Sequence, residues 1–330
     1  MSARRPRGPN LPRVATPAPS AGASPLPAFT HEAFLYRDER SFVRGTASFV
    51  RAGLDAGEPV LVALAAPKIR RLREALGDDD DAVGFTDMAV IGRNPGAILD
   101  AWYRFANGHL AGRRARGIGE PVSPSRRPAE LVECQRHEHL LNLAFAGTAW
   151  HLMCPYDTAA LPASVIDEAL ASHPVVRGDD GRLRPSGRYR PGDAAADFVA
   201  PLGQPGEEPA VHHVDTATLS DARAAVRRRG LAAGLGSRRT HELELVVSEL
   251  LTNSLCHGGG RATLLSWLDG DAVVHEVHDD GYIDDPLAGR RRPPADQLGG
   301  RGLWVVNQLS DLVQVRSSPE GTVVRVVMRR

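Results

Sequence analysis

The sequence contains a single lysine, Lys68, so nearly all of its positive charge comes from arginine. A Walker A loop needs a lysine at the end of a G-x-x-x-x-G run, because the lysine amine reaches the terminal phosphates of the nucleotide. No such glycines precede Lys68, which excludes a P-loop nucleotidase. The H-R-D and D-F-G segments of the protein kinase fold are absent as well, so that fold is also excluded. If this protein handles ATP, it does so without a lysine clamp.

Cysteines, long apolar runs and net charge are also scarce. The three cysteines are widely spaced and form no C-x-x-C pair, so the sequence predicts neither a disulfide framework nor a zinc site. The longest apolar run, residues 60–66, is far shorter than the roughly 20 residues that span a bilayer. The 40 Lys and Arg residues balance the 40 Asp and Glu residues, which argues against a dedicated nucleic-acid binder. We therefore expect a cytoplasmic protein with no DNA partner and no membrane partner.

The length of 330 residues suits two domains. Residues 1–28 are rich in Pro, Ala and Ser and lack an apolar segment, so we expect a disordered tail and not a secretory signal. Over residues 29–174, short apolar runs alternate with helical segments that open with a proline. This alternation predicts an α/β sandwich with a mostly parallel sheet. The expected strands are 33–36, 60–65, 83–86, 116–118 and 150–154, and the expected helices are 67–76, 95–110 (capped by Asn94), 128–145 and 162–172.

Residues 175–210 are rich in Gly, Pro and Asp and are predicted to form a linker. Residues 211–330 make up the second unit, in which Ser220 is expected to cap a helix over 221–230. These elements predict an α+β domain with an antiparallel sheet. Its other expected elements are helices over 240–256 and 303–309 and strands over 262–268, 272–277, 312–317 and 322–328.

Three short segments of the second unit carry the candidate chemistry. Glu249 and Asn253 share one helix face, and a carboxylate beside an amide oxygen suits a metal with oxygen ligands or a base next to that metal. Asp279–Gly281 follows a strand, where a carboxylate can accept a hydrogen bond from an amino group such as adenine N6. Gly299–Leu303 opens a helix, so its backbone N–H groups can approach phosphate oxygens while Arg301 neutralises charge.

In this order and spacing, the three segments resemble the GHKL (Bergerat) ATP-binding fold, which gyrase-type ATPases, heat-shock chaperones and histidine kinases share. The resemblance covers about residues 211–330 and implies ATP and Mg²⁺ as cofactors. It implies that Asn253 holds Mg²⁺ and that Asp279 reads adenine. One departure is Ile283, which stands where the first glycine box usually has its second glycine. The residues that the resemblance assigns to the nucleotide site are Asn253, Asp279, Gly281, Gly300, Arg301, Gly302 and Leu303.

The run Ser248–Ser254, followed by His257 and Gly258, is similar to the anti-sigma regulatory serine kinases of bacteria. This similarity implies transfer of the ATP γ-phosphate to a serine of a STAS-domain anti-sigma antagonist, with Glu249 as the catalytic base. A sigma factor is a further implied partner, and the family makes a homodimer plausible. Two other functions stay open. One is an ATP-dependent protein-binding module without catalysis, which Ile283 suggests, and the other is a histidine kinase-like sensor, although no phosphoacceptor helix is recognisable.

The first unit carries five segments of its own, namely His31-Glu32, Gly57–Val60, Gly119–Pro121, Cys134–Glu138 and Cys154–Asp157. Together they resemble the MEDS sensory domain, named for methanogen, methylotroph and DcmR regulators. That family is thought to sense small molecules, which implies a ligand-sensing domain that regulates the kinase.

The candidate sensory site combines Glu120 and Asp157 at strand ends with Glu133 and His137 on one helix face. The alternative for these four residues is a structural polar network. The neighbouring His137-Glu138-His139 run does not match the H-E-x-x-H pattern of zinc proteases, because residue 141 is leucine.

Overall fold

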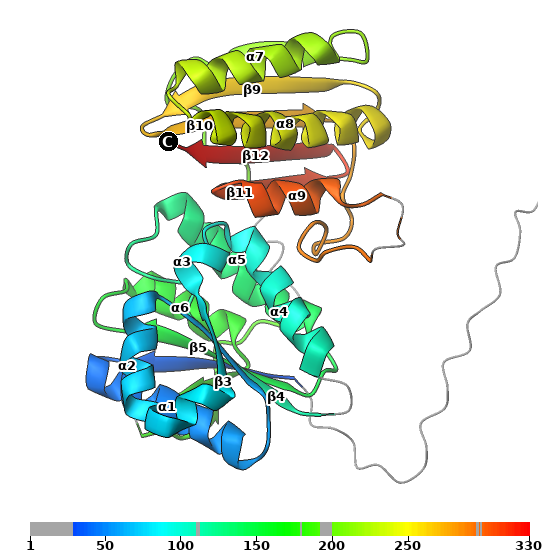
Figure 1. The fold of residues 1–330 in the computed structure, drawn as a ribbon. Helices are drawn as coiled ribbons and strands as arrows, with labels where there is room; N and C mark the ends of the chain where they lie inside the picture. The colour runs from blue at the N-terminus through cyan, green and yellow to red at the C-terminus, as the bar shows by residue number, and fades with distance from the viewer. Residues whose placement is uncertain (1–28, 110–112, 179, 192–199, 295–296, 298) are drawn as a thin grey trace, which may run out of the picture.

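The computed structural model describes residues 29–330 except 110–112, 179, 192–199, 295–296 and 298. The tail predicted for residues 1–28 lies outside the described residues. The described chain forms two layered domains, each with its own sheet and its own buried core (Figure 1). Among the described residues, no helix combines the length and the apolar character needed to cross a membrane.

The first domain is built on a seven-stranded sheet with the order β3-β2-β4-β5-β1-β6-β7. All neighbouring strands are parallel except β6 and β7, so the predicted mostly parallel sheet is confirmed. The strands are β1 (Thr30–Tyr36), β2 (Val60–Leu64), β3 (Val83–Asp87), β4 (Ala115–Gly119), β5 (Trp150–Asp157), β6 (Val175–Arg177) and β7 (Leu183–Pro185).

Helices cover both faces of this sheet, and each face has a separate apolar core. Phe42 and Leu72, from α1 and α2, pack with strand residues on one face. Leu141 and Val165, from α5 and α6, pack on the other face. The helices are α1 (Glu39–Asp55), α2 (Ala66–Leu76), α3 (Met88–Ile91), α4 (Pro95–His109), α5 (Pro128–Ala144) and α6 (Ala163–Ser172), with a 3-10 helix η1 (Gly77–Ala82).

Two features of this domain differ from the sequence expectation. Helix α1 is not among the predicted helices; it begins after Asp38, whose carboxylate accepts a hydrogen bond from the Ser41 amide at 2.7 Å. Strands β6 and β7 lie in the stretch that was predicted to be linker. Its Gly-rich composition reflects a hairpin turn, closed by the Gly181 amide donating to the Gly178 carbonyl at 2.9 Å, and β6 extends the sheet beside β1.

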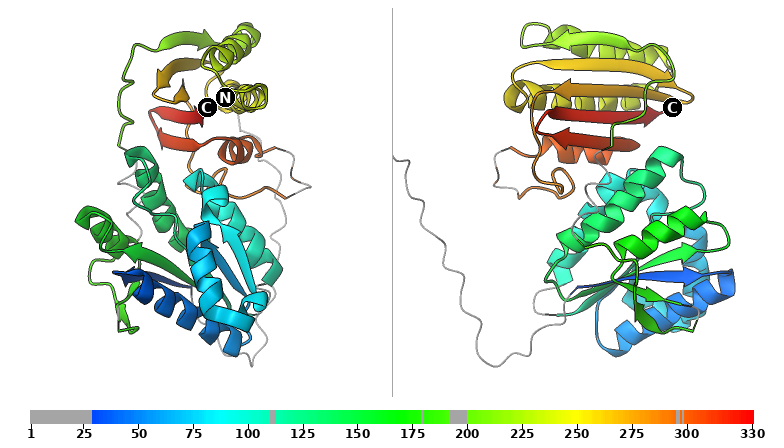
Figure 2. Two further views of the ribbon diagram at one scale, coloured as in Figure 1. Left: turned by 60° about the vertical axis from the view of Figure 1, so that its left-hand side comes forward. Right: turned by 180° about the vertical axis from the view of Figure 1, so that it is seen from behind.

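The second domain has a five-stranded antiparallel sheet with the order β11-β12-β10-β9-β8, and its three helices pack on one face of it (Figure 2). The predicted α+β domain is therefore confirmed. The elements are β8 (Ala210–Val214), α7 (Leu219–Ala232), α8 (Ser237–His257), β9 (Ala262–Asp269), β10 (Ala272–Asp279), α9 (Gly302–Leu309), β11 (Leu312–Ser318) and β12 (Gly321–Arg329).

The expected cap of the first helix in this domain is wrong. Helix α7 starts at Leu219, so Ser220 lies inside it. The turn before the helix is instead organised by Asp215, whose carboxylate accepts hydrogen bonds from the Ala217 and Thr218 amides at 2.9 Å each. Because this Asx-type turn fixes the backbone before residue 219, the helix begins two residues earlier than the serine suggests.

The two domains meet where α4 and α5 lie beside α9 and β11 (Figure 1). Asn94, at the start of α4, joins them. Its amide oxygen accepts from the Gly96 amide at 3.2 Å, which confirms the predicted cap, and also from the Val313 amide at 3.2 Å. Its amide nitrogen donates to the Asn307 carbonyl at 2.9 Å. One side chain therefore caps a helix and fastens the second domain to it.

Candidate functional site

Helix α8 supplies the first part of the candidate nucleotide site. Its apolar positions, among them Val246, Val247 and Leu250, are buried against the sheet, which leaves Glu249 and Asn253 half-buried on a different face. The two polar side chains are one turn apart, so both reach the same side of the helix. The helix ends at His257, and the Gly258 amide donates to the Ser254 carbonyl at 2.7 Å.

Asp279, the last residue of β10, forms the second part of the site. One of its carboxylate oxygens accepts from the Ser254 hydroxyl at 2.5 Å, and the other accepts from the Gly281 amide at 2.8 Å. Thr322 donates in turn to the Gly281 carbonyl at 2.8 Å. A Cβ atom at Gly258 would lie 2.5 Å from the Asp279 carboxyl carbon, so only glycine permits this close approach. The carboxylate is therefore held in one orientation.

The third part is the turn that leads into α9. Gly300 has a φ of 75°, a left-handed conformation that favours glycine. Helix α9 starts at Gly302 without a side-chain cap, so its first backbone N–H groups are available to an anion. A Cβ atom at Gly302 would lie 2.8 Å from a Glu249 carboxylate oxygen and 3.1 Å from the Asn253 amide nitrogen. The start of α9 therefore packs directly against Glu249 and Asn253 of α8.

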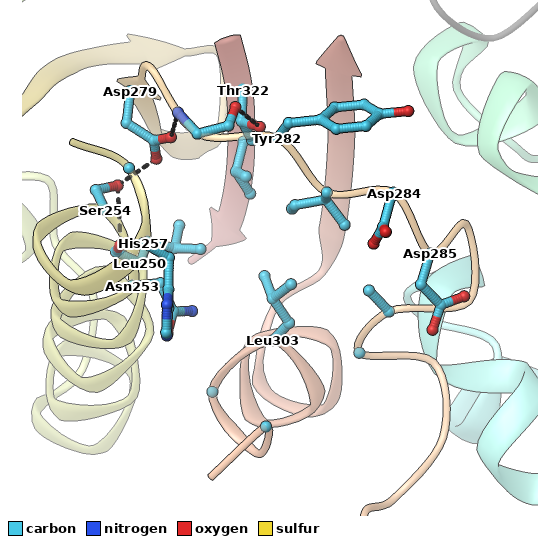
Figure 3. A pocket seen from close by; sticks show the side chains of 18 of the residues that line it. Leu250, Asn253, Ser254, His257, Asp279, Tyr282, Asp284, Asp285, Leu303 and Thr322 are labelled. Carbon is cyan, nitrogen blue, oxygen red and sulfur yellow. Dashed lines mark hydrogen bonds between the residues drawn. The ribbon is translucent and has the colours of Figure 1, made fainter. Parts of the chain in front are cut away.

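The three parts surround one pocket of about 710 Å³ (Figure 3). The Asp279 carboxylate and the Asn253 side-chain amide line the pocket. Gly302, at the uncapped start of α9, lines it as well. A pocket of this size can hold a nucleotide, and these donors and acceptors match a base amino group, a metal with oxygen ligands and phosphate oxygens. The residues present therefore fit ATP with Mg²⁺.

The structure brings most of the predicted nucleotide residues together. Asn253, Asp279, Gly281, Gly300, Gly302 and Leu303 all line the pocket. Within the described part of its lining, Glu249 and Arg301 are not included. Glu249 is next to Gly302, which lines the pocket. The Arg301 guanidinium donates to the Pro294 carbonyl at 3.2 Å. Sequence reasoning gave no role to Ser254 or Thr322, which hold Asp279 and Gly281. Ser254 ends the quoted run Ser248–Ser254, whereas no sequence signal pointed to Thr322.

The loop between β10 and α9 covers one side of the pocket and also contacts the first domain. Ile283, Arg291 and Pro293 line the pocket. The Ile283 amide donates to the Ser317 hydroxyl at 2.8 Å, so the residue that replaces a glycine is anchored to β11. Arg290, in the same loop, is buried between the domains.

The four candidate sensory residues do not form one site, which corrects the sequence prediction. Glu120 lies at the end of β4, where its carboxylate accepts from the Lys68 amine at 2.6 and 2.7 Å and from the Tyr36 hydroxyl at 2.9 Å. Asp157 lines the adjoining pocket of about 500 Å³ together with Tyr36 and Lys68. Burial and the Glu120 carboxylate raise the pKa of Tyr36 far above its usual value, so Tyr36 stays a hydrogen-bond donor.

Glu133 and His137, the other two, lie elsewhere. Glu133 points into the domain interface, where its carboxylate is 2.9 Å from Arg316 of β11. His137 is fully buried, and burial lowers its pKa to about 3. The two share a helix face as predicted, and both are buried. Arg290 lies 3.8 Å from the Glu133 carboxylate, and its charge adds to the effect of burial on the pKa of His137.

Comparison with known proteins agrees with both halves of this description. Residues 30–174 match the family model of the MEDS (MEthanogen/methylotroph, DcmR Sensory) domain, and residues 213–328 match that of the histidine kinase-like ATPase domain. No protein with a curated description matches the chain.

Two solved structures give weak matches. The RsbU and RsbW domains of Rv1364c from Mycobacterium tuberculosis match with 18% identity and a TM-score of 0.28, over 36% of this chain and 32% of that one. The histidine kinase AdeS from Acinetobacter baumannii matches with 13% identity and a TM-score of 0.22, over 37% of this chain and 68% of that one. This chain thus spans about a third of the first of these proteins. By its two family matches, the chain joins a MEDS domain to a histidine kinase-like ATPase domain.

Proposed function

We propose that the second domain binds ATP with Mg²⁺ and phosphorylates a serine of a STAS-type anti-sigma antagonist, under the control of the first domain. The observation that carries the proposal is the convergence of Glu249 and Asn253 on Gly302, at the start of a helix whose N–H groups have no side-chain cap. A base, an amide oxygen and an anion site within a few ångströms of each other are the parts that phosphoryl transfer needs.

Each part has a separate role in this reaction. Asp279 accepts a hydrogen bond from the adenine amino group, and its orientation is held by Ser254 and Gly281. Asn253 supplies an oxygen to Mg²⁺, which when bound neutralises charge on the phosphates. The amides at Gly302 face the phosphate oxygens. Glu249 accepts the proton of the attacking serine hydroxyl. Most of the catalysis is therefore positioning and charge stabilisation.

Control by the first domain is supported by the contacts of the loop that covers the pocket. The Arg292 amide donates to Asp100 of α4 at 3.1 Å, and the Arg291 guanidinium lies 5.5 Å from the Tyr103 ring centre. Arg291 also lines the nucleotide pocket. A ligand that shifts α4 in the first domain would therefore move a wall of the pocket, which is a direct route from sensing to nucleotide affinity.

The test is Glu249→Ala in the full chain, with phosphate transfer from radiolabelled ATP to a STAS protein co-purified from the native host. Loss of a general base lowers a rate by about 10²- to 10⁴-fold, while ATP affinity measured by calorimetry stays within a few-fold. Glu244→Ala is the matched control, because Glu244 lies on the same helix but, unlike Glu249, is not among the nearest neighbours of Gly302. Transfer that is unchanged in Glu249→Ala sinks the assignment of the base.

A second candidate function is an ATP-dependent protein-binding module without catalysis. It is favoured by Ile283, a bulky residue that lines the pocket in place of a glycine. Nucleotide-dependent binding of the partner that survives Glu249→Ala, with no detectable turnover in either protein, would support this function over the kinase. An acid-labile phosphate on the chain itself would instead indicate a histidine kinase.

A further inference from the structure

Four buried side chains with metal-ligating atoms converge in the core of the first domain, away from both pockets. They are His31, Glu138, Cys154 and His173, and one ligand atom from each lies within 4.8 Å of the others. All four are at most 1% exposed. They come from β1, α5, β5 and the residue after α6, so four separate elements aim one polar group each at the same point. The proposed function makes no use of this cluster.

The surrounding hydrogen bonds fix which histidine nitrogens face the cluster. Asn142 donates through its amide nitrogen to the Ser172 carbonyl at 2.7 Å, so its oxygen accepts from Nδ1 of His31 at 3.1 Å. His173 donates through Nδ1 to the Ala169 carbonyl at 2.8 Å, because a carbonyl can only accept. In the neutral form of both rings the proton is therefore on Nδ1, and the lone pair of Nε2 points into the cluster. Metal-bound histidines are commonly oriented in this way.

Without a cation, the Cys154 thiol donates to the Glu138 carboxylate, but the two neutral histidines turn lone pairs toward it. The Nε2 lone pair of His31 lies 3.1 Å from a Glu138 carboxylate oxygen, and Nε2 of His173 lies 3.5 Å from the same oxygen. The Nε2 atom of His173 and the second carboxylate oxygen of Glu138 have no hydrogen-bond partner. Burying two lone pairs against a carboxylate is costly unless a positive charge compensates them.

The spacing of the ligand atoms matches a small tetrahedral ion. The Cys154 sulfur lies 3.4 Å from Nε2 of His31 and 3.2 Å from the Glu138 oxygen. Bonds of about 2.0 to 2.3 Å to nitrogen, oxygen and sulfur give ligand–ligand distances of roughly 3.3 to 3.8 Å in a tetrahedron around zinc. Four of the six ligand–ligand distances are 3.1 to 3.5 Å, close to the lower end of that range, and all six are within 4.8 Å.

We propose that His31, Glu138, Cys154 and His173 bind one divalent transition-metal ion, and that Zn²⁺ suits this set of two nitrogens, one oxygen and one sulfur. Binding displaces the thiol proton of Cys154, which passes to solvent, and no electron is transferred. The thiolate and the carboxylate then balance the two charges of the ion, so the buried site is neutral. The ion would tie α5, which also carries Glu133 at the domain interface, to the central strands β1 and β5.

The test begins with the full-length protein and its matched cysteine variants. Metal content is measured by plasma mass spectrometry after expression with added Zn²⁺. We expect about one zinc per chain in the parent protein and a loss of at least ten-fold in Cys154→Ala and Glu138→Gln. Cys134→Ala is the control, because this thiol is equally buried but donates to the Pro121 carbonyl outside the cluster. Equal zinc in Cys154→Ala and Cys134→Ala would overturn the proposal.

A second measurement avoids variants that fail to fold. The parent protein is stripped with a chelator and titrated with Zn²⁺ or Co²⁺. We expect Zn²⁺ to raise the melting temperature by several degrees, since an ion that binds only the folded state stabilises it. Bound Co²⁺ is expected to show tetrahedral ligand-field bands and a thiolate charge-transfer band. A stripped protein that takes up neither ion, or a Co²⁺ complex without the thiolate band, contradicts the proposal.

Discussion

The nucleotide pocket of the second domain and the His/Glu/Cys cluster of the first domain are built in opposite ways. The pocket opens to solvent, and Asn253 and Asp279 are only half-buried in it. The cluster is sealed, with its four side chains at most 1% exposed. An open site can exchange its ligand within one catalytic cycle, whereas a sealed site releases an ion only when the surrounding core opens. The difference suits the turnover proposed for the second domain and the structural tie proposed for the first.

Helix α5 carries both Glu138 of the buried cluster and Glu133 at the interface with the second domain, so the first test is made on this helix. Glu133 on α5 faces three arginines, Arg316 at 2.9 Å and Arg136 and Arg290 at 3.8 Å each, and all four side chains are largely buried. In Glu133→Gln the arginines lose their carboxylate. Because an uncompensated buried charge is costly, we expect the free energy of unfolding to fall by about 3 to 5 kcal/mol.

Urea unfolding of the full chain measures this loss. Asp271→Asn is the matched control, since the Arg127–Asp271 pair also crosses the interface but is about half exposed, and such pairs contribute roughly 0 to 1 kcal/mol. If the two variants lose equal free energy of unfolding, the domains are not coupled through a buried charge. The buried cluster of the first domain and the nucleotide pocket of the second would then be independent of each other.

The open pocket should respond in its affinity for ATP. In Asp279→Asn the carboxylate acceptor becomes a neutral amide. Loss of a hydrogen bond to a charged group costs about 1.5 to 3 kcal/mol, so we expect the Kd for ATP to rise about 10- to 100-fold in calorimetry. Asp280→Asn, at the next and more exposed position, should leave the Kd within two-fold. An unchanged Kd in Asp279→Asn would mean that this carboxylate does not read the base.

A smaller effect concerns the pH dependence of the second domain. Burial, together with the charges of Arg229 and His212, lowers the pKa of His275 to about 3. Between pH 6.5 and pH 3 the unfolded chain therefore binds a proton that the folded chain does not. Stability from this group falls as the pH falls through that window, by about 1.4 kcal/mol per pH unit, or about 2 kcal/mol between pH 6.5 and 5.

Unfolding in urea at pH 7 and pH 5 checks this sign. His275→Gln, which cannot take up a proton in this range, should show a shallower loss than the parent. If parent and variant lose the same free energy of unfolding between pH 7 and pH 5, His275 is not held neutral in the folded protein. Water would then reach this part of the core of the second domain.

The sequence predicts the second domain well because its site is local. Glu249 and Asn253 share one helix turn, and each glycine segment is contiguous, so their order along the chain is enough to show the resemblance that assigns them. The parallel sheet of the first domain follows from equally local patterns. The missed α1 begins with a polar run after Asp38, and β6 resembles a linker because its hairpin is short and rich in Gly and Asp.

The buried cluster was beyond sequence reasoning for a physical reason. His31 and His173 lie 142 positions apart, and the fold alone brings them to Glu138 and Cys154. Widely spaced cysteines give no metal pattern, and the zinc-protease test fails at residue 141, although Glu138 lies within the tested run. The sequence prediction chose His137 because it shares a helix face with Glu133, and so it passed over the neighbouring Glu138.

The single lysine has a practical consequence. Lys68 carries the only side-chain amine in the sequence; its side chain is one-third exposed, lines the second pocket, and donates to Glu120 and Tyr36. An amine-selective acylating reagent therefore has one side-chain amine to label, in addition to the α-amine. The rate at which Lys68 is labelled, measured by mass spectrometry, therefore reports whether a ligand occupies the pocket beside it.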